Sequence, residues 1–274
     1  MEKFKVFEPI YIIKRGKEIV NFFCSIYGIN PNNRFSKFVK EYEKLYQNND
    51  LPFFSSEKHI ELLAGFKDFV ELEMIYSSGI YKDASMSELK RLFDGNILHF
   101  GDANQTPRDL QFQFSIAALL KNNGCTVKMC EPDFIFHYDR IDYPVAAKRL
   151  SSQKKIEKRI KEAEKQISKY DNPGIIALSI ENLFKQEDQI INNKPFSQSA
   201  EELDNRFINY TKQNFNKEYF NDRKYISAFF FYLSLPVCFK NSFYFGYVNR
   251  LIIVPIAPEG SCEFLKFKIL GECL

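Results

Sequence analysis

A carboxylate and a lysine fall where two neighbouring strands would bring them together. Asp133 opens an expected strand, "DFIFHY", and Lys148 stands near the end of the next, "YPVAAKRL". The polar turn "DRID" joins the two strands, so the start of the first should lie beside the end of the second. Sites that cleave phosphodiesters need carboxylates for Mg²⁺ and a cation near the phosphate. The spacing therefore predicts a Mg²⁺- or Mn²⁺-dependent site where Asp133 and Lys148 converge.

Regular elements on both sides of this strand pair complete an α/β unit. The preceding segment reads as a helix with Pro107 in its first turn and Gly124 just past its end. The following segment has helical periodicity and leads into the β-branched strand "IIALSI". We expect helices at 106–124 and 152–170 and strands at 125–129, 133–138, 143–150 and 175–180. This α-β-β-β-α-β order is typical of a mixed sheet flanked by helices.

Residues 106–180 resemble the PD-(D/E)XK nuclease superfamily. Pro132–Asp133 is similar to the family's Pro-Asp pair, and Ala146-Ala147-Lys148 stands in the place of its (D/E)XK triplet. Gln166-x-x-x-Tyr170 is similar to the Gln-x-x-x-Tyr motif of the RecB-like branch. The resemblance implies a restriction-endonuclease-like fold and a metal-dependent nuclease that hydrolyses DNA. It also suggests a role in bacterial restriction or anti-phage defence.

The same resemblance implies a role for each matched side chain. Lys148 would orient the attacking water and stabilise the developing charge, while Gln166 and Tyr170 would position the substrate strand. Gln113 takes the place of a glutamate on the family's first helix and would be a metal ligand beside Asp133.

Two positions depart from the family's pattern. Ala146 replaces the acid before the lysine and Gln113 replaces the helix glutamate, so a single carboxylate of the family's set remains. One hypothesis brings a second carboxylate into the site, with Glu131 as a catalytic and metal-binding residue and Glu164 or Glu157 as other choices. The other hypothesis is a catalytically degenerate nuclease-fold protein that binds nucleic acid or acts as a subunit of a complex.

The expected helix at 152–170 has one apolar stripe and many cations. The stripe should pack on the sheet; it consists of Ile156, Ile160, Ala163 and Ile167. Cations crowd the remaining surface and begin next to Lys148, where they would contact the phosphates of DNA. The residues predicted to bind nucleic acid are Arg149, Lys154, Lys155, Lys158 and Lys165.

The rest of the chain suggests a division near residue 95. Residues 1–95 are expected to form a mostly helical region, and residues 96–274 the nuclease-like domain. In the first region we expect helices at 17–28, 34–47, 56–78 and 85–95. Near the C-terminus, "AEELDNRFINYTKQNF" and "ISAFFFYLSLPV" are expected to be helices and "RLIIVPIAP" a strand. The aromatic stretch at 225–247 is alternatively the interface of a homodimer or a larger complex.

Composition limits the remaining classes of function. The net charge of +3 permits a nucleic-acid partner without requiring one. The six cysteines form no CxxC pair and the chain has only three histidines, so a zinc site has few candidates. The N-terminus lacks the apolar core of a signal peptide, and the longest apolar run is shorter than the roughly 18 residues of a membrane span. We expect a soluble, cytoplasmic protein without membrane contact.

Overall fold

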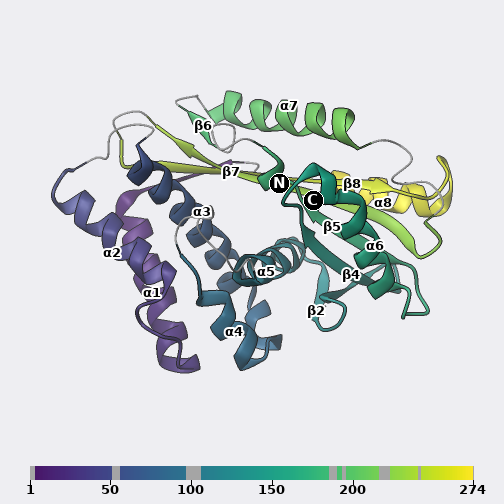
Figure 1. Ribbon diagram of the computed structural model, residues 1–274, viewed down its shortest axis with the longest axis horizontal. Coiled ribbons are helices and arrows are strands. Elements are labelled where there is room, and N and C mark those ends of the chain that lie inside the picture. The colour runs from purple at the N-terminus through teal and green to yellow at the C-terminus, as the bar shows by residue number, and fades with distance from the viewer. Residues whose placement is uncertain are drawn as a thin grey trace.

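One mixed β-sheet runs through the molecule and separates two groups of helices in the computed structural model (Figure 1). The structure describes residues 4–50, 56–96, 106–184, 190–192, 196–215, 223–239 and 242–273. The strands are β1 (Phe4–Phe7), β2 (Thr126–Met129), β3 (Phe134–Tyr138), β4 (Ile141–Arg149), β5 (Gly174–Ser179), β6 (Ile191–Asn192), β7 (Ile226–Cys238) and β8 (Phe245–Pro255).

The helices are α1 (Pro9–Tyr27), α2 (Arg34–Gln47), α3 (Glu57–Ser78), α4 (Met86–Phe93), α5 (Thr106–Asn122), α6 (Ile156–Ile167), α7 (Phe196–Asn214) and α8 (Cys262–Cys273). Short 3-10 segments are η1 (Ile80–Asp83), η3 (Gln153–Lys155) and η4 (Glu181–Leu183). The strands are ordered β1-β8-β7-β5-β4-β3-β2, and β6 pairs with β7. The predicted mixed sheet flanked by helices, with a mostly helical N-terminal part, is confirmed.

Each face of the sheet has its own hydrophobic cluster. The first cluster contains side chains of helices α1 through α5 and of α8. These pack against alternate side chains of the strands, among them Val145 and Phe230. The second joins α6 and α7 to the opposite side chains, among them Ala146 and Phe229. Figure 1 shows α7 on one side of the sheet and α1 to α4 on the other. The first cluster runs from Phe7 to Leu270, so the N-terminal helices pack on the same sheet as the C-terminal strands.

The segment from 106 to 180 follows the predicted order α5-β2-β3-β4-α6-β5. Strands β2, β3 and β4 are antiparallel neighbours, and β5 returns parallel to β4 after α6. Helix α6 is shorter than the predicted 152–170, because residues 153–155 form a 3-10 turn and the helix ends at Ile167. Its stripe of Ile156, Ile160, Ala163 and Ile167 is completely buried, as the periodicity predicts.

The prediction of a helix at "ISAFFFYLSLPV" is wrong, because residues 226–238 form strand β7. This strand lies between β5 and β8, and all 13 of its residues are buried. A strand covered on both faces has no alternation of polar and apolar residues, so its sequence resembles a buried helix. Residues 226–238 are thus covered within one chain, whereas Tyr225 and Tyr244 of the aromatic stretch at 225–247 are exposed. Helix α7 confirms the other helix predicted in this region.

The ends of the chain differ from the sequence expectation as well. β1 precedes an α1 that begins at Pro9 rather than near residue 17, and β1 pairs with β8 at the sheet edge. α8 forms where only a tail was expected. No helix in the described ranges is long and apolar enough to cross a membrane.

Substitution of Gly174 tests how closely β5 packs against β4 and α6. A Cβ atom there would lie 2.3 Å from the Pro144 carbonyl oxygen and 2.7 Å from Ile167 Cγ2. We expect Gly174→Ala to lower the free energy of unfolding by about 1–3 kcal/mol, measured by urea denaturation. Gly271→Ala is the matched control, because its Cβ would meet Ile253 at 3.6 Å, an ordinary contact. Equal stability of the two variants would contradict the close approach.

Candidate functional site

Asp133 and Lys148 meet at the end of β4. Phe134 pairs with Val145, so Asp133 lies beside the last residues of β4. Its Oδ2 accepts a hydrogen bond of 2.7 Å from the Ala147 backbone N–H and lies 3.4 Å from Lys148 Nζ. The two side chains are 9% and 14% exposed. The predicted convergence of carboxylate and lysine is therefore present.

Gln113 completes the surroundings of Asp133 from the other side. It projects from α5, and its Nε2 donates a hydrogen bond of 2.8 Å to Asp133 Oδ1. Both carboxylate oxygens consequently accept from N–H donors. Such donors stabilise the ionised form of the carboxylate.

Burial raises the pKa of Asp133 from 3.8 to about 6. The ammonium of Lys148 and the Ala147 N–H act in the opposite direction, because they stabilise the ionised form. The rise shows that loss of water around Asp133 outweighs both partners. Asp133 is thus ionised at neutral pH and takes up a proton near pH 6.

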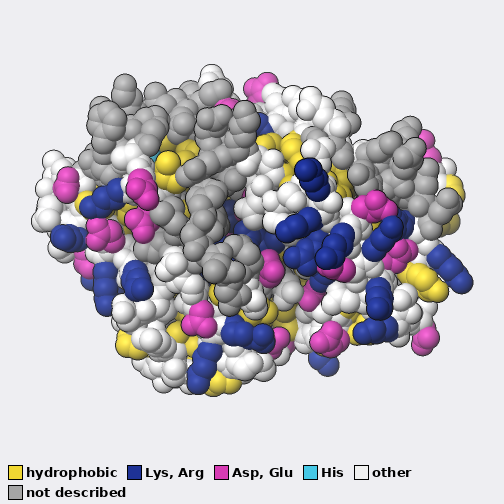
Figure 2. Space-filling model, viewed as in Figure 1, with side chains coloured by type: hydrophobic (Ala, Val, Ile, Leu, Met, Phe, Trp, Pro, Cys, Tyr) yellow, Lys and Arg dark blue, Asp and Glu magenta, His cyan; other side chains and the backbone are white. Residues whose placement is uncertain are grey.

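A cavity of about 420 Å³ opens beside this carboxylate, between α5, the end of β4 and α6. Five cationic side chains line it against two carboxylates, those of Asp109 and Glu162. Dark blue side chains gather over the region of α6 in Figure 2. The cationic residues are Lys148, Arg149, Arg159, Lys165 and Lys169. The cavity is therefore suited to an anion.

The two carboxylates of the cavity wall are already close to arginines. Glu162 accepts a hydrogen bond of 3.0 Å from Arg159 Nη1. Asp109 Oδ1 lies 3.9 Å from Arg149 Nη1, and burial raises the pKa of Asp109. Since Asp109 is four residues before Gln113 in α5, both project from the same side of that helix. Lys165, Lys169, Gln166 and the Nη1 of Arg149, which lies 3.9 Å from Asp109, remain to meet a ligand.

The predicted site residues do not all reach the cavity. Gln166 and Lys165 line it, and the buried Gln166 Oε1 has no hydrogen-bond partner among the described residues. Tyr170 follows the end of α6 and Glu131 is exposed, and neither lines the cavity. The other carboxylates considered are paired elsewhere, Glu157 with Lys161 and Glu164 with Arg223.

The predicted nucleic-acid-binding residues divide into two groups. Lys154, Lys155 and Lys158 are exposed outside the cavity. Arg149 instead points away from the surface, and its side chain is only 6% exposed. Strand alternation places Arg149 on the α5 face of the sheet.

The donor set around Asp133 does not fit Mg²⁺. This ion needs oxygen ligands, usually one or two carboxylates with water or phosphate. Ala146 offers no side-chain oxygen and is buried in the second hydrophobic cluster. Gln113 presents its N–H to Asp133, and no group of three or more acidic, histidine or cysteine side chains suited to a metal occurs in the described part of the chain.

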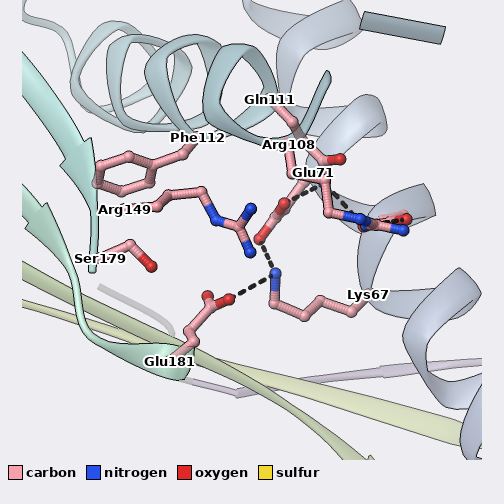
Figure 3. Close-up of a pocket in the computed structure, with 9 residues that line it drawn as sticks. Lys67, Glu71, Arg108, Gln111, Phe112, Arg149, Ser179 and Glu181 are labelled. Atoms are coloured by element: carbon pink, nitrogen blue, oxygen red, sulfur yellow. Dashed lines mark hydrogen bonds and ion pairs between the residues drawn. The ribbon is translucent and has the colours of Figure 1, made fainter. Parts of the chain in front are cut away.

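A cluster of buried charges adjoins the cavity, and Arg149 lines both (Figure 3). Lys67 Nζ lies 2.6 Å from Glu71 and 3.1 Å from Glu181. Asp68 forms ion pairs with two arginines, since Nη1 of Arg34 and Nη1 of Arg108 each lie 2.6 Å from its Oδ2. The space enclosed is only about 10 Å³, so it holds no more than one water.

Comparisons of the chain with protein-family models, with curated proteins and with solved structures find no match.

Replacing Asp133 tests the cost of its burial. The folded protein holds the proton more tightly than the unfolded chain, so the free energy of unfolding falls as pH rises from about 4 to about 6. Asp133→Asn removes the ionisation and with it this fall in the free energy of unfolding. The amide oxygen of the asparagine can still accept the hydrogen bond from the Ala147 N–H. We expect the variant to be more stable than the wild type at pH 7.5, by up to about 3 kcal/mol.

The measurement is urea denaturation of both proteins from pH 4 to pH 8. The exposed Asp171→Asn serves as the control, and its pH profile should follow that of the wild type. An Asp133→Asn profile parallel to the wild type would show that the pKa of Asp133 is not raised.

Proposed function

We propose that the protein binds the phosphate backbone of a nucleic acid, DNA first, in the cavity between α5 and α6. The observation that carries this proposal is the excess of cations over carboxylates on the cavity wall. Phosphate contacts by lysine and arginine supply most of the sequence-independent affinity of DNA-binding proteins. The exposed Lys154, Lys155 and Lys158 extend the basic surface beyond the cavity.

A restriction-endonuclease-like frame that has lost its metal site is part of the same proposal. The order α5-β2-β3-β4-α6-β5 supports the frame, and so does the meeting of Asp133, Lys148 and Gln113. The loss is supported by Ala146, by the amide of Gln113, and by the exposed position of Glu131, which does not line the cavity. Activity in restriction or anti-phage defence is proposed on the sequence resemblance alone.

Metal-dependent DNA hydrolysis is the second candidate. It is favoured by the 3.4 Å approach of Lys148 to Asp133, with Gln166 on the wall of the same cavity. Both candidates require the same first event, which is binding of a nucleic-acid phosphate. They differ in whether a metal ion is held beside Asp133.

Lys165 provides the test of backbone binding. We expect Lys165→Gln to weaken binding of a fluorescent DNA duplex several-fold and to lower the salt slope of log K by about one. Lys161→Gln is the matched control, since Lys161 lies one turn away on α6, pairs with Glu157 and does not line the cavity. Fluorescence anisotropy across a series of NaCl concentrations measures both. Equal effects of the two changes would place the phosphate contact outside the cavity.

Metal binding separates the two candidates. We expect calorimetry to find no Mg²⁺ or Mn²⁺ binding that depends on Asp133, and plasmid and single-stranded DNA to stay uncleaved with either ion. The reason is that the oxygens of Asp133 already accept from Gln113 and Ala147. Cleavage that Asp133→Asn and Lys148→Ala abolish, and that Asp171→Asn leaves intact, would establish hydrolysis instead.

A further inference from the structure

We propose that the cavity binds a phosphate monoester, the group found at a phosphorylated strand end or in a free nucleotide, with Arg149 as its innermost ligand. The inference deepens the proposed function, since it names the form of phosphate that the cavity accepts. Its supports are the position of Arg149, the unpaired oxygen of Gln166 and the depth of the cavity.

Arg149 is a buried cation with unused hydrogen-bonding capacity. Its side chain is 6% exposed, and Nη1 has no hydrogen-bond partner among the residues that the structure describes. The nearby carboxylate of Asp109 stands 3.9 Å away, beyond hydrogen-bond distance. Figure 3 shows the guanidinium directed toward Lys67 and Glu71, where the cavity adjoins the cluster of buried charges. Buried charged groups are normally hydrogen-bonded, so Arg149 is prepared for an anionic oxygen.

Gln166 offers the complementary group from the opposite wall. Its buried Oε1 has no donor within the described part of the chain, and the residue lines the same cavity from α6. An acceptor of this kind requires an O–H or N–H on the ligand. An internal phosphodiester carries no such proton. A phosphate monoester has a P–OH group near its second pKa of about 6, and a free nucleotide also has a sugar hydroxyl.

The depth of Arg149 distinguishes a terminal phosphate from an internal one. An internal phosphodiester carries one negative charge and has a nucleotide on each side. The two nucleotides keep it at the protein surface, because both would have to enter a cavity with it. A terminal phosphate has one substituent and can enter a cavity as far as a side chain that is 6% exposed. The volume of about 420 Å³ is within the range of small-ligand pockets.

Further cations match the second charge of a monoester. Lys148 and Arg159 line the same cavity as Arg149, with Lys165 farther along α6 and Lys169 just after the end of that helix. Charge-assisted hydrogen bonds to arginine are among the strong ones, and the guanidinium fork fits two phosphate oxygens. The cavity therefore favours a monoester, which carries between one and two negative charges near its second pKa, over the singly charged backbone.

The experiment compares one fluorescein-labelled single strand in three forms, with a 5′-phosphate, with a 3′-phosphate and with hydroxyl groups at both ends. We expect at least one phosphorylated form to bind the wild type about tenfold more tightly than the hydroxyl form. Arg149→Gln should remove this preference while binding of the hydroxyl form persists. Gln166→Leu, at a half-buried position, should reduce the preference and serves as the second variant if Arg149→Gln misfolds by circular dichroism.

Lys161→Gln is the control and should keep the full preference. Competition with a deoxynucleoside 5′-monophosphate identifies the source of the monoester: competition as strong as that of the phosphorylated strand assigns the cavity to a free nucleotide, and weak competition assigns it to a strand end. Arg149-dependent binding of the monophosphate without any DNA binding would retain the inference and reject the proposed function. Equal affinity for all three strands, without binding of the monophosphate, would overturn the inference, as would full preference in folded Arg149→Gln and Gln166→Leu.

Discussion

A buried ionic network joins the N-terminal helices to the sheet, and the cavity depends on it. The carboxylate of Asp68 in α3 forms ion pairs with Arg34 of α2 and Arg108 of α5. Lys67, also in α3, forms an ion pair with Glu181, which follows β5. Ser234 of β7 has its hydroxyl oxygen within hydrogen-bond distance of the carboxylates of Glu71 and Glu181, and its single proton serves one of them at a time. Burial lowers the pKa of Arg34 to about 10 and raises that of Glu71. Removing one partner from such a network leaves a buried charge uncompensated, which typically costs about 3–5 kcal/mol.

The network also fixes the rotation of α5. Arg108 and Gln111 point toward Asp68 and Glu71, so the side of the helix that carries Asp109 and Gln113 must face the cavity. Gln113 reaches Asp133 for this reason. A helix held by hydrogen-bonded charges has fewer acceptable rotations than one held by apolar contacts alone. The surroundings of Asp133 are therefore set in part by residues that do not touch it.

The sequence predicted the features that local spacing determines. Asp133 and Lys148 converge because a short turn joins their strands, and the stripe of α6 is buried because its period is helical. The sequence could not reveal β7, whose burial on both faces removes alternation, or contacts between distant residues such as Glu71 and Ser234. Asp109 could have been found, because its spacing of four from Gln113 places both on one side of α5.

The character of the cavity follows from the charges that remain around Asp133. The methyl group of Ala146 and the amide of Gln113 add no negative charge beside Asp133. Five cations from β4, α6 and the residues after α6 therefore face only two carboxylates on the cavity wall. This excess of cations underlies the proposed binding of phosphate, in which Arg149, buried and with an unpaired nitrogen, is the innermost ligand.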